Sequence, residues 1–582
     1  MMMVGAPAAP PAAASAAARR RAAAPRVALT STRNSRAAGR SDSLPLRADG
    51  GATVDARALT LRADGGGAAA VDARAGSVAA APSSASGSAA PTLARHLKTL
   101  DLTAIGIGGI VGAGIFVLSG QAAARYAGPA VTLSFALAGV ACLFCGLAYS
   151  ELSSMFPVAG SAYAYATAGL GGVAGWLIGW DLVLEYSVGA ATVSVGLSGY
   201  LCSILKDFGA PCPPAFASAP FSRNAVTGAW VPTGAAFNAP AVAVALLLAA
   251  LAVRGVRESA AVTNALVALK IGVLLIFLLA SVGHVDSRRW SPFFIPADAA
   301  GNFGAKGVIA GSSVVFFSFV GFDAISTSAG EAVDPQRAVP IATLASLGVC
   351  TALYICVALA MTGLVDYRAL DVADPLAVAL DAAGPGLAWV RPIVKLGAVC
   401  GLASVILVLV NGQARITFAM ASDGLLPAAL ARVHPVHKTP AAALALAGAT
   451  AGVLAALVPI DALGEMVSIG TLAAFAFVCA TVLVLRRTRP AHPRPFRVPC
   501  SPAVPALGIA MCAVQMVVLP PETWARLAAW TAVGGAVYYF HARHHALPIE
   551  ARVARLFQAR AGDDVPPPAT PAPLLPRDDD GW

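Results

Sequence analysis

The stretch GIGGIVGAGIF, residues 106–116, guides the interpretation of the whole chain, because five of its eleven residues are glycines within an apolar segment. Glycine destabilises a helix interior by about 0.5–1 kcal/mol relative to alanine. Close helix packing through Gly108 and Gly112 explains two or three of these glycines. A phosphate-binding G-x-G-x-x-G is excluded, because Val111 occupies the third glycine position. A helix that breaks at 112–114 explains the rest.

The composition indicates an integral membrane protein. The chain has 582 residues, of which 57% are hydrophobic and 12% charged, against about 25% charged in soluble domains. Several apolar blocks reach the ~20 residues that cross a bilayer. The net charge of +10 does not indicate nucleic-acid binding, because the basic residues lie in tails and loops. Residues 484–497 carry five arginines and no acid, which predicts a cytoplasmic loop by the positive-inside rule.

Twelve apolar blocks predict an all-α membrane protein of about twelve transmembrane helices. Because the number is even, both termini are expected on one side of the membrane, the cytoplasmic side. The expected spans are 101–120, 129–150, 171–201, 239–254, 262–284, 307–327, 340–364, 391–420, 440–459, 464–485, 502–519 and 525–541.

The chain divides into three regions. Residues 1–97 are rich in alanine and arginine and lack a sustained apolar period, so we expect a disordered extension. Seven arginines precede the first acid, Asp42, which also fits an organelle transit peptide; upstream sequence placed wrongly in the coding frame is a third alternative. Residues 98–541 form the expected transmembrane domain, and 542–582 a proline-rich cytoplasmic tail.

A broken helix inside a membrane indicates a binding site. In hydrocarbon an unpaired backbone group costs several kcal/mol, so the break persists only where it lines a cavity. Secondary transporters use such breaks: half-helix N-termini face an anionic group, and unwound carbonyls face a cation.

Several motifs together resemble the amino acid–polyamine–organocation superfamily of permeases, and within it the cationic amino acid transporter branch and its bacterial relatives. The motifs cover nearly the whole expected membrane region. They are LTAIGIGGIVGAGIFV (102–117), AGPAVTLSFALAGV (127–140), AYSELSSMFPVAGSAYAYA (148–166), GWLIGWDLVLEY (175–186), FFSFVGFDAISTSAGEAVDPQRAVP (316–340) and RITFAMASDGLLP (415–427).

The resemblance implies a LeuT-like fold: two inverted five-helix repeats, the first helix of each broken, and two further helices. The second break is then expected in FFSFVGFD. The implied function is secondary active transport of amino acids by alternating access, as proton-coupled symport. The resemblance and the sequence imply no enzyme activity, cofactor or metal, since no nucleophile–base or metal-ligand set is found.

The resemblance also implies a substrate site built from backbone dipoles, which can hold both ends of a zwitterion without a charged side chain. Amides at the first break receive the carboxylate, and carbonyls at the second receive the α-ammonium. Phe317 is the expected lid over the substrate, with core packing as the alternative. The expected residues are Gly112, Ala113 and Gly114 at the first break, and Phe317, Ser318 and Val320 at the second.

Four of the ionisable residues inside expected spans are candidates for a function, because such groups within a membrane usually serve one. Asp323 follows the second break and is expected in a substrate or coupling role. Lys270 corresponds to a lysine that replaces the bound cation in proton-coupled relatives, so it is the expected proton carrier. Asp181 and Glu185 are four residues apart, hence on one helix face, and are second candidates for a cation or proton.

Several alternatives stay open at this point. The same fold also serves amino acid exchangers, polyamine transporters and non-transporting amino acid sensors. The expected partners are an amino acid, a proton and the lipid bilayer, with no nucleic acid. The bacterial inner membrane is the expected location, with an organelle envelope as the alternative. Cys202 and Cys212 flank an expected external loop; free thiols are favoured over a disulfide.

Overall fold

The structure is a computed structural model that describes residues 97–158, 160–223, 229–255, 260–297, 303–329 and 332–558. These residues belong to one compact unit that runs from Ser88 to Trp582. Nearly all of the N-terminal extension and the last part of the C-terminal tail lie outside the described residues. The assignments of these two regions therefore stay predictions.

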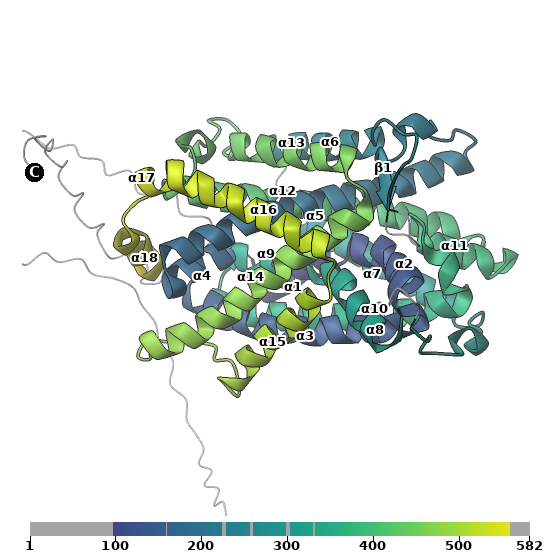
Figure 1. Cartoon of the computed structure of the whole chain (residues 1–582), viewed down its shortest axis with the longest axis horizontal. Helices are drawn as coiled ribbons and strands as arrows, with labels where there is room; N and C mark the ends of the chain where they lie inside the picture. Colours follow the sequence, from purple (N-terminus) through teal and green to yellow (C-terminus); the bar gives the residue numbers. More distant parts are fainter. Residues whose placement is uncertain are drawn as a thin grey trace, which may run out of the picture. The chain divides into compact units, whose positions relative to one another are not determined.

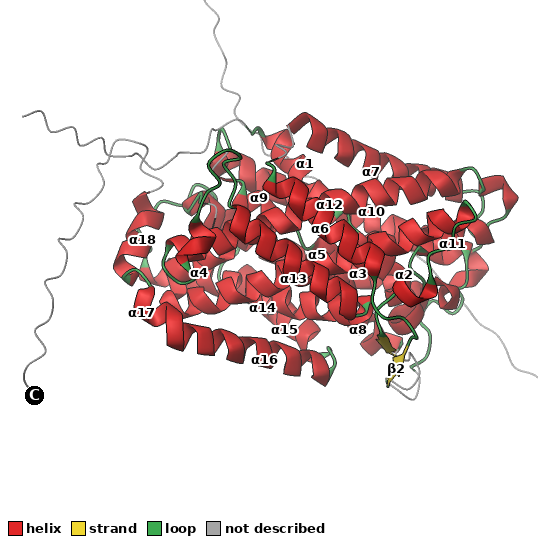
Figure 2. Cartoon of the chain, turned by 90° about the horizontal axis from the view of Figure 1, so that it is seen from above, coloured by secondary structure: helices red, strands yellow, loops and turns green. Residues whose placement is uncertain are grey.

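Six long helices form the main body of this unit, and Figures 1 and 2 show them running along a common direction in two perpendicular views. Their sequences are apolar almost all round, as expected of helices surrounded by lipid and other helices. They are α3 (Val131–Met155), α5 (Gly172–Asp207), α7 (Ala260–Ser281), α10 (Pro335–Leu364), α12 (Val390–Ser422) and α14 (Ile460–Thr488).

Shorter helices complete the body and its ends. Four of them are apolar: α6 (Ala239–Val253), α13 (Ala441–Leu457), α15 (Ala503–Val517) and α16 (Pro521–Val537). The others are α4 (Ser161–Leu170), α11 (Pro375–Ala382), α17 (Arg543–His545) and α18 (Ile549–Gln558). Two further helices, α1 and α8, are interrupted and continue into short pieces; they are described with the site below.

Small residues let neighbouring helices approach closely, which is how helices in lipid associate. A side chain at Gly448 of α13 would collide with Ala249 of α6. In the same way, a side chain at Gly412 of α12 would collide with the ring of Tyr186 on α5. In the pairs α6–α13 and α5–α12, a side chain of one helix therefore packs directly against the backbone of the other.

By length and composition, fewer helices qualify as membrane spans than the twelve apolar blocks that the sequence predicts. Among the described residues, seven helices qualify as spans, or up to eight if the bent pair α15–α16 counts as one. The 57-residue run Thr99–Met155 is one candidate but holds two of the expected blocks, and α6 and α13 are shorter than 18 residues. All twelve blocks lie on helices; twelve crossings remain a prediction.

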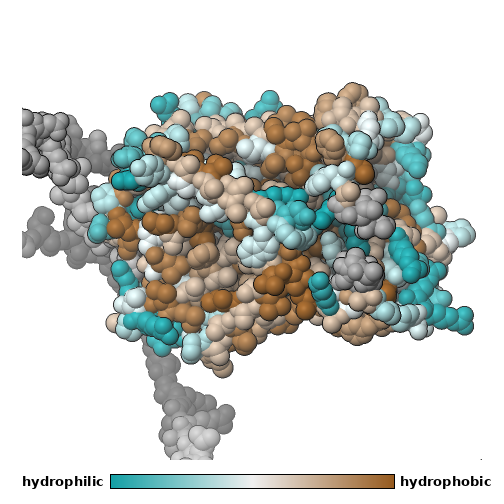
Figure 3. Space-filling view, in the orientation of Figure 1, coloured by the Kyte–Doolittle hydropathy of each residue, from teal (hydrophilic) through white to brown (hydrophobic). Residues whose placement is uncertain are grey.

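The surface supports a membrane location. In the space-filling view, hydrophobic residues cover much of the middle of the visible face, and hydrophilic residues gather toward its two ends (Figure 3). Exposed large apolar side chains lie on the lipid-facing sides of several helices, including Leu247, Leu279, Val453 and Val517. Together with the apolar helices, this shows an integral membrane protein.

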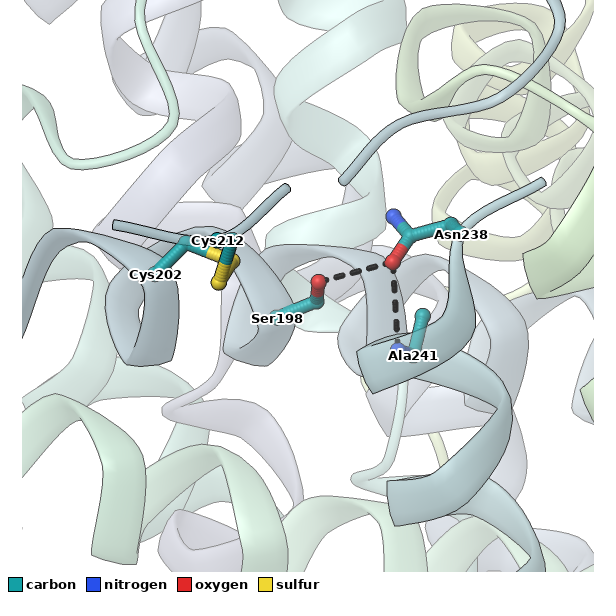
Figure 4. The surroundings of a disulfide bond; sticks show 5 residues. All are labelled: Ser198, Cys202, Cys212, Asn238 and Ala241. Atoms are coloured by element: carbon teal, nitrogen blue, oxygen red, sulfur yellow. Dashed lines mark hydrogen bonds between the residues drawn. A yellow bond between two sulfur atoms is a disulfide. The ribbon is translucent and has the colours of Figure 1, made fainter. Parts of the chain in front are cut away.

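A small β-hairpin and a disulfide follow α5, which the sequence did not predict. Strands β1 (Phe221–Arg223) and β2 (Trp230–Pro232) pair antiparallel, with Ser222 opposite Val231. Cys202 at the end of α5 is bonded to Cys212 (Figure 4), so the preference for free thiols was wrong. The chain that follows Asp207 folds back along the last turn of α5 and brings the two sulfurs together.

The loop re-enters the body through a capped helix. Asn238 precedes α6, and its side-chain oxygen accepts a hydrogen bond from the amide of Ala241 at 3.1 Å (Figure 4). The same oxygen accepts a second hydrogen bond, from the hydroxyl of Ser198 on α5, at 2.8 Å. An asparagine N-cap satisfies one amide that the first helical turn leaves unpaired. Here it also ties α6 to α5.

Candidate functional site

The first interrupted helix is α1 (Thr99–Ile110), and it stops inside the glycine-rich stretch. Val111 is extended, with φ −73° and ψ 94°. The chain then resumes as a π-helical turn, Gly114–Leu118, followed by α2 (Ser119–Ala122). Among the described residues, the amides of Gly112 and Ala113 have no hydrogen-bond partner. The structure thus has an interruption where the sequence predicts one, with two free donors.

The second interrupted helix is α8 (Gly304–Val315). A 3-10 turn, Phe316–Phe319, follows it, and then Val320 is extended with φ −59° and ψ 133°. Gly321 has φ +115°, a conformation that residues with a side chain rarely adopt. The helix resumes as α9 (Asp323–Thr327). This interruption also lies where the family resemblance places it.

The two interruptions touch each other through their backbones. A Cβ atom added at Gly109 would lie 3.0 Å from the carbonyl oxygen of Gly321, and one added at Gly321 would lie 2.7 Å from Gly109. A Cβ atom at Gly114 would collide with Ser318. Part of the glycine content is therefore explained by this crossing, where only backbones without side chains fit.

Side chains from other helices satisfy the carbonyls around the first break. Such carbonyls lose their helical partner, and a buried unpaired carbonyl is costly. Three carbonyls accept hydrogen bonds in this way: Gly108 from Lys270 Nζ at 2.7 Å, Ile110 from the Tyr354 hydroxyl at 2.8 Å, and Phe116 from the Tyr200 hydroxyl at 2.8 Å. Acceptors at this break are thus occupied by the protein, whereas two of its donors are not.

Tyr354 of α10 reaches both interruptions. Its hydroxyl lies 2.8 Å from the carbonyl oxygen of Ile110 and 3.1 Å from that of Ser318. A hydroxyl carries one hydrogen, so it donates to one carbonyl at a time or divides the bond between them. Tyr354 therefore links the two broken helices. Sequence analysis did not find it; the available signal was a tyrosine inside an apolar span.

A narrow cavity lies between the two interruptions. Its accessible volume is about 10 Å³, roughly the room that one water molecule needs. The two segments are thus closed on each other, and a larger solute requires them to move apart. The lining residues are Gly109, Ile110, Gly112, Ala113, Gly114, Val193, Phe317, Val320, Val405 and Leu409.

Five of the expected substrate residues line this cavity, and two do not. Gly112, Ala113 and Gly114 lie on one side, and Phe317 and Val320 on the other. Ser318 is buried beside it, and its hydroxyl has no hydrogen-bond partner among the described residues.

The carbonyls expected to bind the α-ammonium are partly occupied. The carbonyl of Ser318 accepts a hydrogen bond from the Tyr354 hydroxyl at 3.1 Å, and the carbonyl of Phe317 accepts one from the amide of Val320 at 3.1 Å. A carbonyl oxygen has two lone pairs, so each retains one acceptor position.

Asp323 takes a different place from the one expected for direct substrate contact. Its carboxylate accepts the hydroxyl of Tyr186 and the amide of Gly321, the latter at 3.2 Å. It therefore stabilises the left-handed turn at the second interruption from behind the cavity wall. A coupling role remains open to it, because Glu185 is close enough for the two charges to interact.

Asp181 and Glu185 lie together on α5, buried against α14. Within the described part of the chain, none of their four carboxylate oxygens has a hydrogen bond of good geometry, although the Thr471 hydroxyl lies close to Glu185. Asp181 approaches the backbone of Gly470. Lys270, fully buried, lies elsewhere, beside α1 and α12. The structure thus separates the expected proton carrier from these two acids.

Known proteins resemble the chain over most of its length. Residues 97–538 match the amino acid permease family. The methylthioribose transporter of Bacillus subtilis (strain 168) is 41% identical, covering 78% of this chain and 95% of that protein. The branched-chain amino acid permease BcaP of the same organism is also 41% identical, over 78% and 94%. The chloroplastic cationic amino acid transporter 9 of Arabidopsis thaliana is 37% identical, over 68% and 67%.

Two interrupted helices around a buried cavity, in an apolar helical body, are typical of membrane transporters, and the family and relative matches point to a non-enzymatic transporter. The chain belongs to the amino acid permease family, as the motifs indicated. Within the described ranges, no group of three or more His, Cys, Asp or Glu side chains is placed to hold a metal ion.

Proposed function

We propose that the chain is a secondary transporter that carries an amino acid by alternating access. The unpartnered amides of Gly112 and Ala113, facing the second interruption across a closed cavity, are the observation that carries this proposal. They offer two hydrogen-bond donors to a carboxylate. Carbonyls at Phe317 and Ser318 retain lone pairs for the α-ammonium.

The packing of the helices supports an arrangement of two inverted repeats with twelve crossings. If α1 and α8 begin the repeats, α3, α5 and α6 of the first correspond to α10, α12 and α13 of the second. These are the helices that pack on each other pairwise: α3 on α10, α5 on α12, and α6 on α13. Pairwise contact between equivalent helices is what a two-fold axis through the body produces.

The lining of the cavity favours a neutral substrate with a small apolar side chain. Val193, Val405 and Leu409 face the two interruptions, and no charged side chain is among the lining residues described. A cationic side chain buried there would lack a counter-charge. This agrees with the name of the branched-chain permease. Methylthioribose, named for another relative, is the second candidate; it lacks the carboxylate that the free amides suit.

We place proton coupling at Lys270. Its ammonium hydrogen-bonds to the carbonyl of Gly108, three residues before the first break, so the loss of a proton changes the stability of the broken helix directly. Asp181 and Glu185 are second carriers, because their buried carboxylates lack good hydrogen bonds among the described residues. Buried ionisable groups inside a membrane protein mark such pathways.

The charge distribution supports cytoplasmic termini. At the end of the body where α3, α12 and α14 finish, arginine and lysine far outnumber aspartate and glutamate in the described chain. At the opposite end the two signs are nearly balanced. The positive-inside rule therefore puts the first end, with both termini, in the cytoplasm, here of a bacterial cell or, as the alternative, within an organelle.

Uptake into proteoliposomes tests the proposal. Radiolabelled leucine, alanine, lysine, putrescine and methylthioribose are offered with an imposed proton gradient, a sodium gradient, or neither. We expect accumulation of leucine, driven by protons and blocked by free branched-chain acids but not by their esters. Uptake only against preloaded amino acid would indicate an exchanger, and binding without uptake a sensor. Preference for putrescine or methylthioribose would overturn the substrate proposal.

A further inference from the structure

A second pocket shares no lining residue with the cavity between the two interruptions. It opens at the start of α10, against the loop that follows α14, and has a volume of about 410 Å³. It is lined by Asp334, Gln336, Arg337, Pro340, Ile341, Leu344, Pro495 and Phe496.

The lining of this pocket divides into an apolar and a polar part. Ile341, Leu344 and Phe496 provide apolar surface, and Ile341 is 46% exposed. Gln336 and Arg337 come from the first turn of α10. An occupant that fits both parts has a hydrocarbon portion and a polar, anionic portion.

One wall of the pocket is held in place by a buried acid. Glu151 of α3 is 1% exposed and accepts hydrogen bonds from Arg486 Nε at 3.0 Å and from the amide of Val498 at 2.7 Å. Arg494 lies 3.3 Å from the same carboxylate. The amide of Phe496 donates to Ser154 at 3.3 Å. The pocket therefore exists before any occupant binds.

This arrangement uses Arg486, in the last turn of α14, and Arg494 of the loop that follows, and leaves other arginines available. Arg337, Arg487 and Arg497 are exposed, and in the described part of the chain they have no acidic partner. Arg497 lies close enough to Arg494 for the two charges to repel. Asp334, at the start of α10, offsets one positive charge. Arg497, which follows the lining residue Phe496, therefore leaves a positive excess beside the pocket after Asp334 offsets Arg337.

The pocket also lies at the level where a membrane ends. The span candidates Pro335–Leu364 and Ile460–Thr488 begin and end beside it. In the orientation proposed above, this is the cytoplasmic boundary, where the leaflet carries anionic lipids that attract arginines. We infer that the pocket binds an anionic phospholipid, with its headgroup at Arg337 and Arg497 and an acyl chain along Ile341, Leu344 and Phe496. The inference rests on the proposed orientation and is independent of the transported substrate.

Native mass spectrometry of the full chain in detergent tests this inference. The protein is titrated with dioleoyl phosphatidylglycerol and, separately, with dioleoyl phosphatidylcholine. We expect the double variant R337Q/R497Q to bind phosphatidylglycerol at least about tenfold more weakly than wild type, since each arginine near anionic lipid contributes roughly fivefold. Phosphatidylcholine binding should stay unchanged. Arg432→Gln, an exposed arginine at the same end, is the matched control and should change neither.

Two further measurements distinguish a bound phospholipid from a free phosphate compound, since both carry the same anionic group. Ile341→Gln should weaken both lipids, because it removes apolar surface that an acyl chain covers. Glycerol 1-phosphate, the headgroup chemistry without acyl chains, should not displace the lipid at millimolar concentration. Equal binding of phosphatidylglycerol by wild type and R337Q/R497Q would overturn the inference. Full competition by glycerol 1-phosphate would also overturn it, by indicating a phosphate-ion site. Unchanged melting temperatures in phosphatidylcholine confirm that the variants are folded.

Discussion

The two helix interruptions have the same position in their respective helices, but they are built from different residues. The first, at 111–113, lies in a stretch with five glycines and leaves amide donors free. The second, at 316–322, has four phenylalanines and one glycine. The carboxylate of Asp323 stabilises it by accepting a hydrogen bond from the amide of Gly321 in the same segment. A helix can thus be opened either by removing side chains or by a left-handed turn that a local acid stabilises.

The difference also shows where each interruption obtains its stability. The carbonyls of the first depend on Lys270, Tyr354 and Tyr200, which come from three other helices. The turn of the second depends on Asp323, two residues away, and on Tyr186 behind it. The first interruption is therefore sensitive to movements of its neighbours, which the proposed proton coupling at Lys270 requires.

The largest effect is expected from a substitution that breaks the contact between the two interruptions. Gly321→Val should prevent a folded, monodisperse transporter, because φ +115° is strained for any side chain, by about 1–3 kcal/mol, and the new Cβ atom would lie 2.7 Å from the backbone of Gly109. Size-exclusion chromatography and the melting temperature measure this. Gly348→Ala, where nothing lies within 4 Å, is the control. A well-folded Gly321→Val would show that the crossing is not as close as described.

The next effect separates substrate binding from packing within the first interruption. Gly114→Val and Gly112→Val should both abolish substrate binding while membrane insertion persists, since a side chain blocks approach to the amides. Gly114→Ala should still be severe, because its Cβ atom collides with Ser318. Gly112→Ala should be milder, because its Cβ atom would lie 3.1 Å from a methyl group of Val405. Equilibrium binding of the transported amino acid is the measurement; normal affinity in the valine variants would contradict the site.

The coupling proposal predicts a loss confined to gradient-driven accumulation. Lys270→Met keeps the apolar stem and removes the ammonium that donates to Gly108. Accumulation in response to a proton gradient should fall to background, while counterflow exchange persists, because exchange needs no net coupling. Lys306→Met, at an exposed lysine, should behave as wild type.

Three results would redirect this proposal. If Lys270→Met still concentrates substrate when a pH gradient is imposed, Lys270 is a structural lysine. If wild-type uptake follows sodium instead of protons, the coupling ion itself is wrong. Should Glu185→Gln alone abolish proton-driven uptake, the acids of α5 would replace Lys270 as the carrier.

A smaller effect tests whether Tyr354 joins the two interruptions. Tyr354→Phe removes the hydroxyl near Ile110 and Ser318 and should slow maximal transport about fivefold, since a buried hydrogen bond contributes about 1 kcal/mol. Tyr149→Phe is the matched control, because that buried hydroxyl has no hydrogen-bond partner among the described residues. Equal rates for the two variants would show that the link has no role in transport.

The smallest expected effect lies outside both interruptions. Deletion of residues 1–90 should leave transport by the purified, reconstituted protein unchanged, because the composition of this region cannot form a packed core. Initial uptake rates at equal protein density measure this. A loss of intrinsic activity would contradict the prediction that the extension is disordered and dispensable.

The sequence predicted the first interruption better than the second for a physical reason. A cluster of glycines is visible in one stretch and has a direct effect on helix stability, so the break at 112–114 follows from local propensity. The second break has one glycine among aromatic residues, and only family resemblance located it. Asp323 was expected near the substrate for the same reason; its actual partners, Tyr186 and Gly321, depend on packing that no local pattern reveals.

By itself, the sequence determined the membrane location, the helical class, the family and the first interruption, because hydrophobic block length and glycine content act locally along the chain. The tertiary structure alone decided which residues meet: Tyr354 with both breaks and Gly109 with Gly321 at the site, and Cys202 with Cys212 away from it. These contacts join segments whose proximity depends on how whole helices pack. Such proximity is a property of the folded body and is absent from any single stretch of sequence.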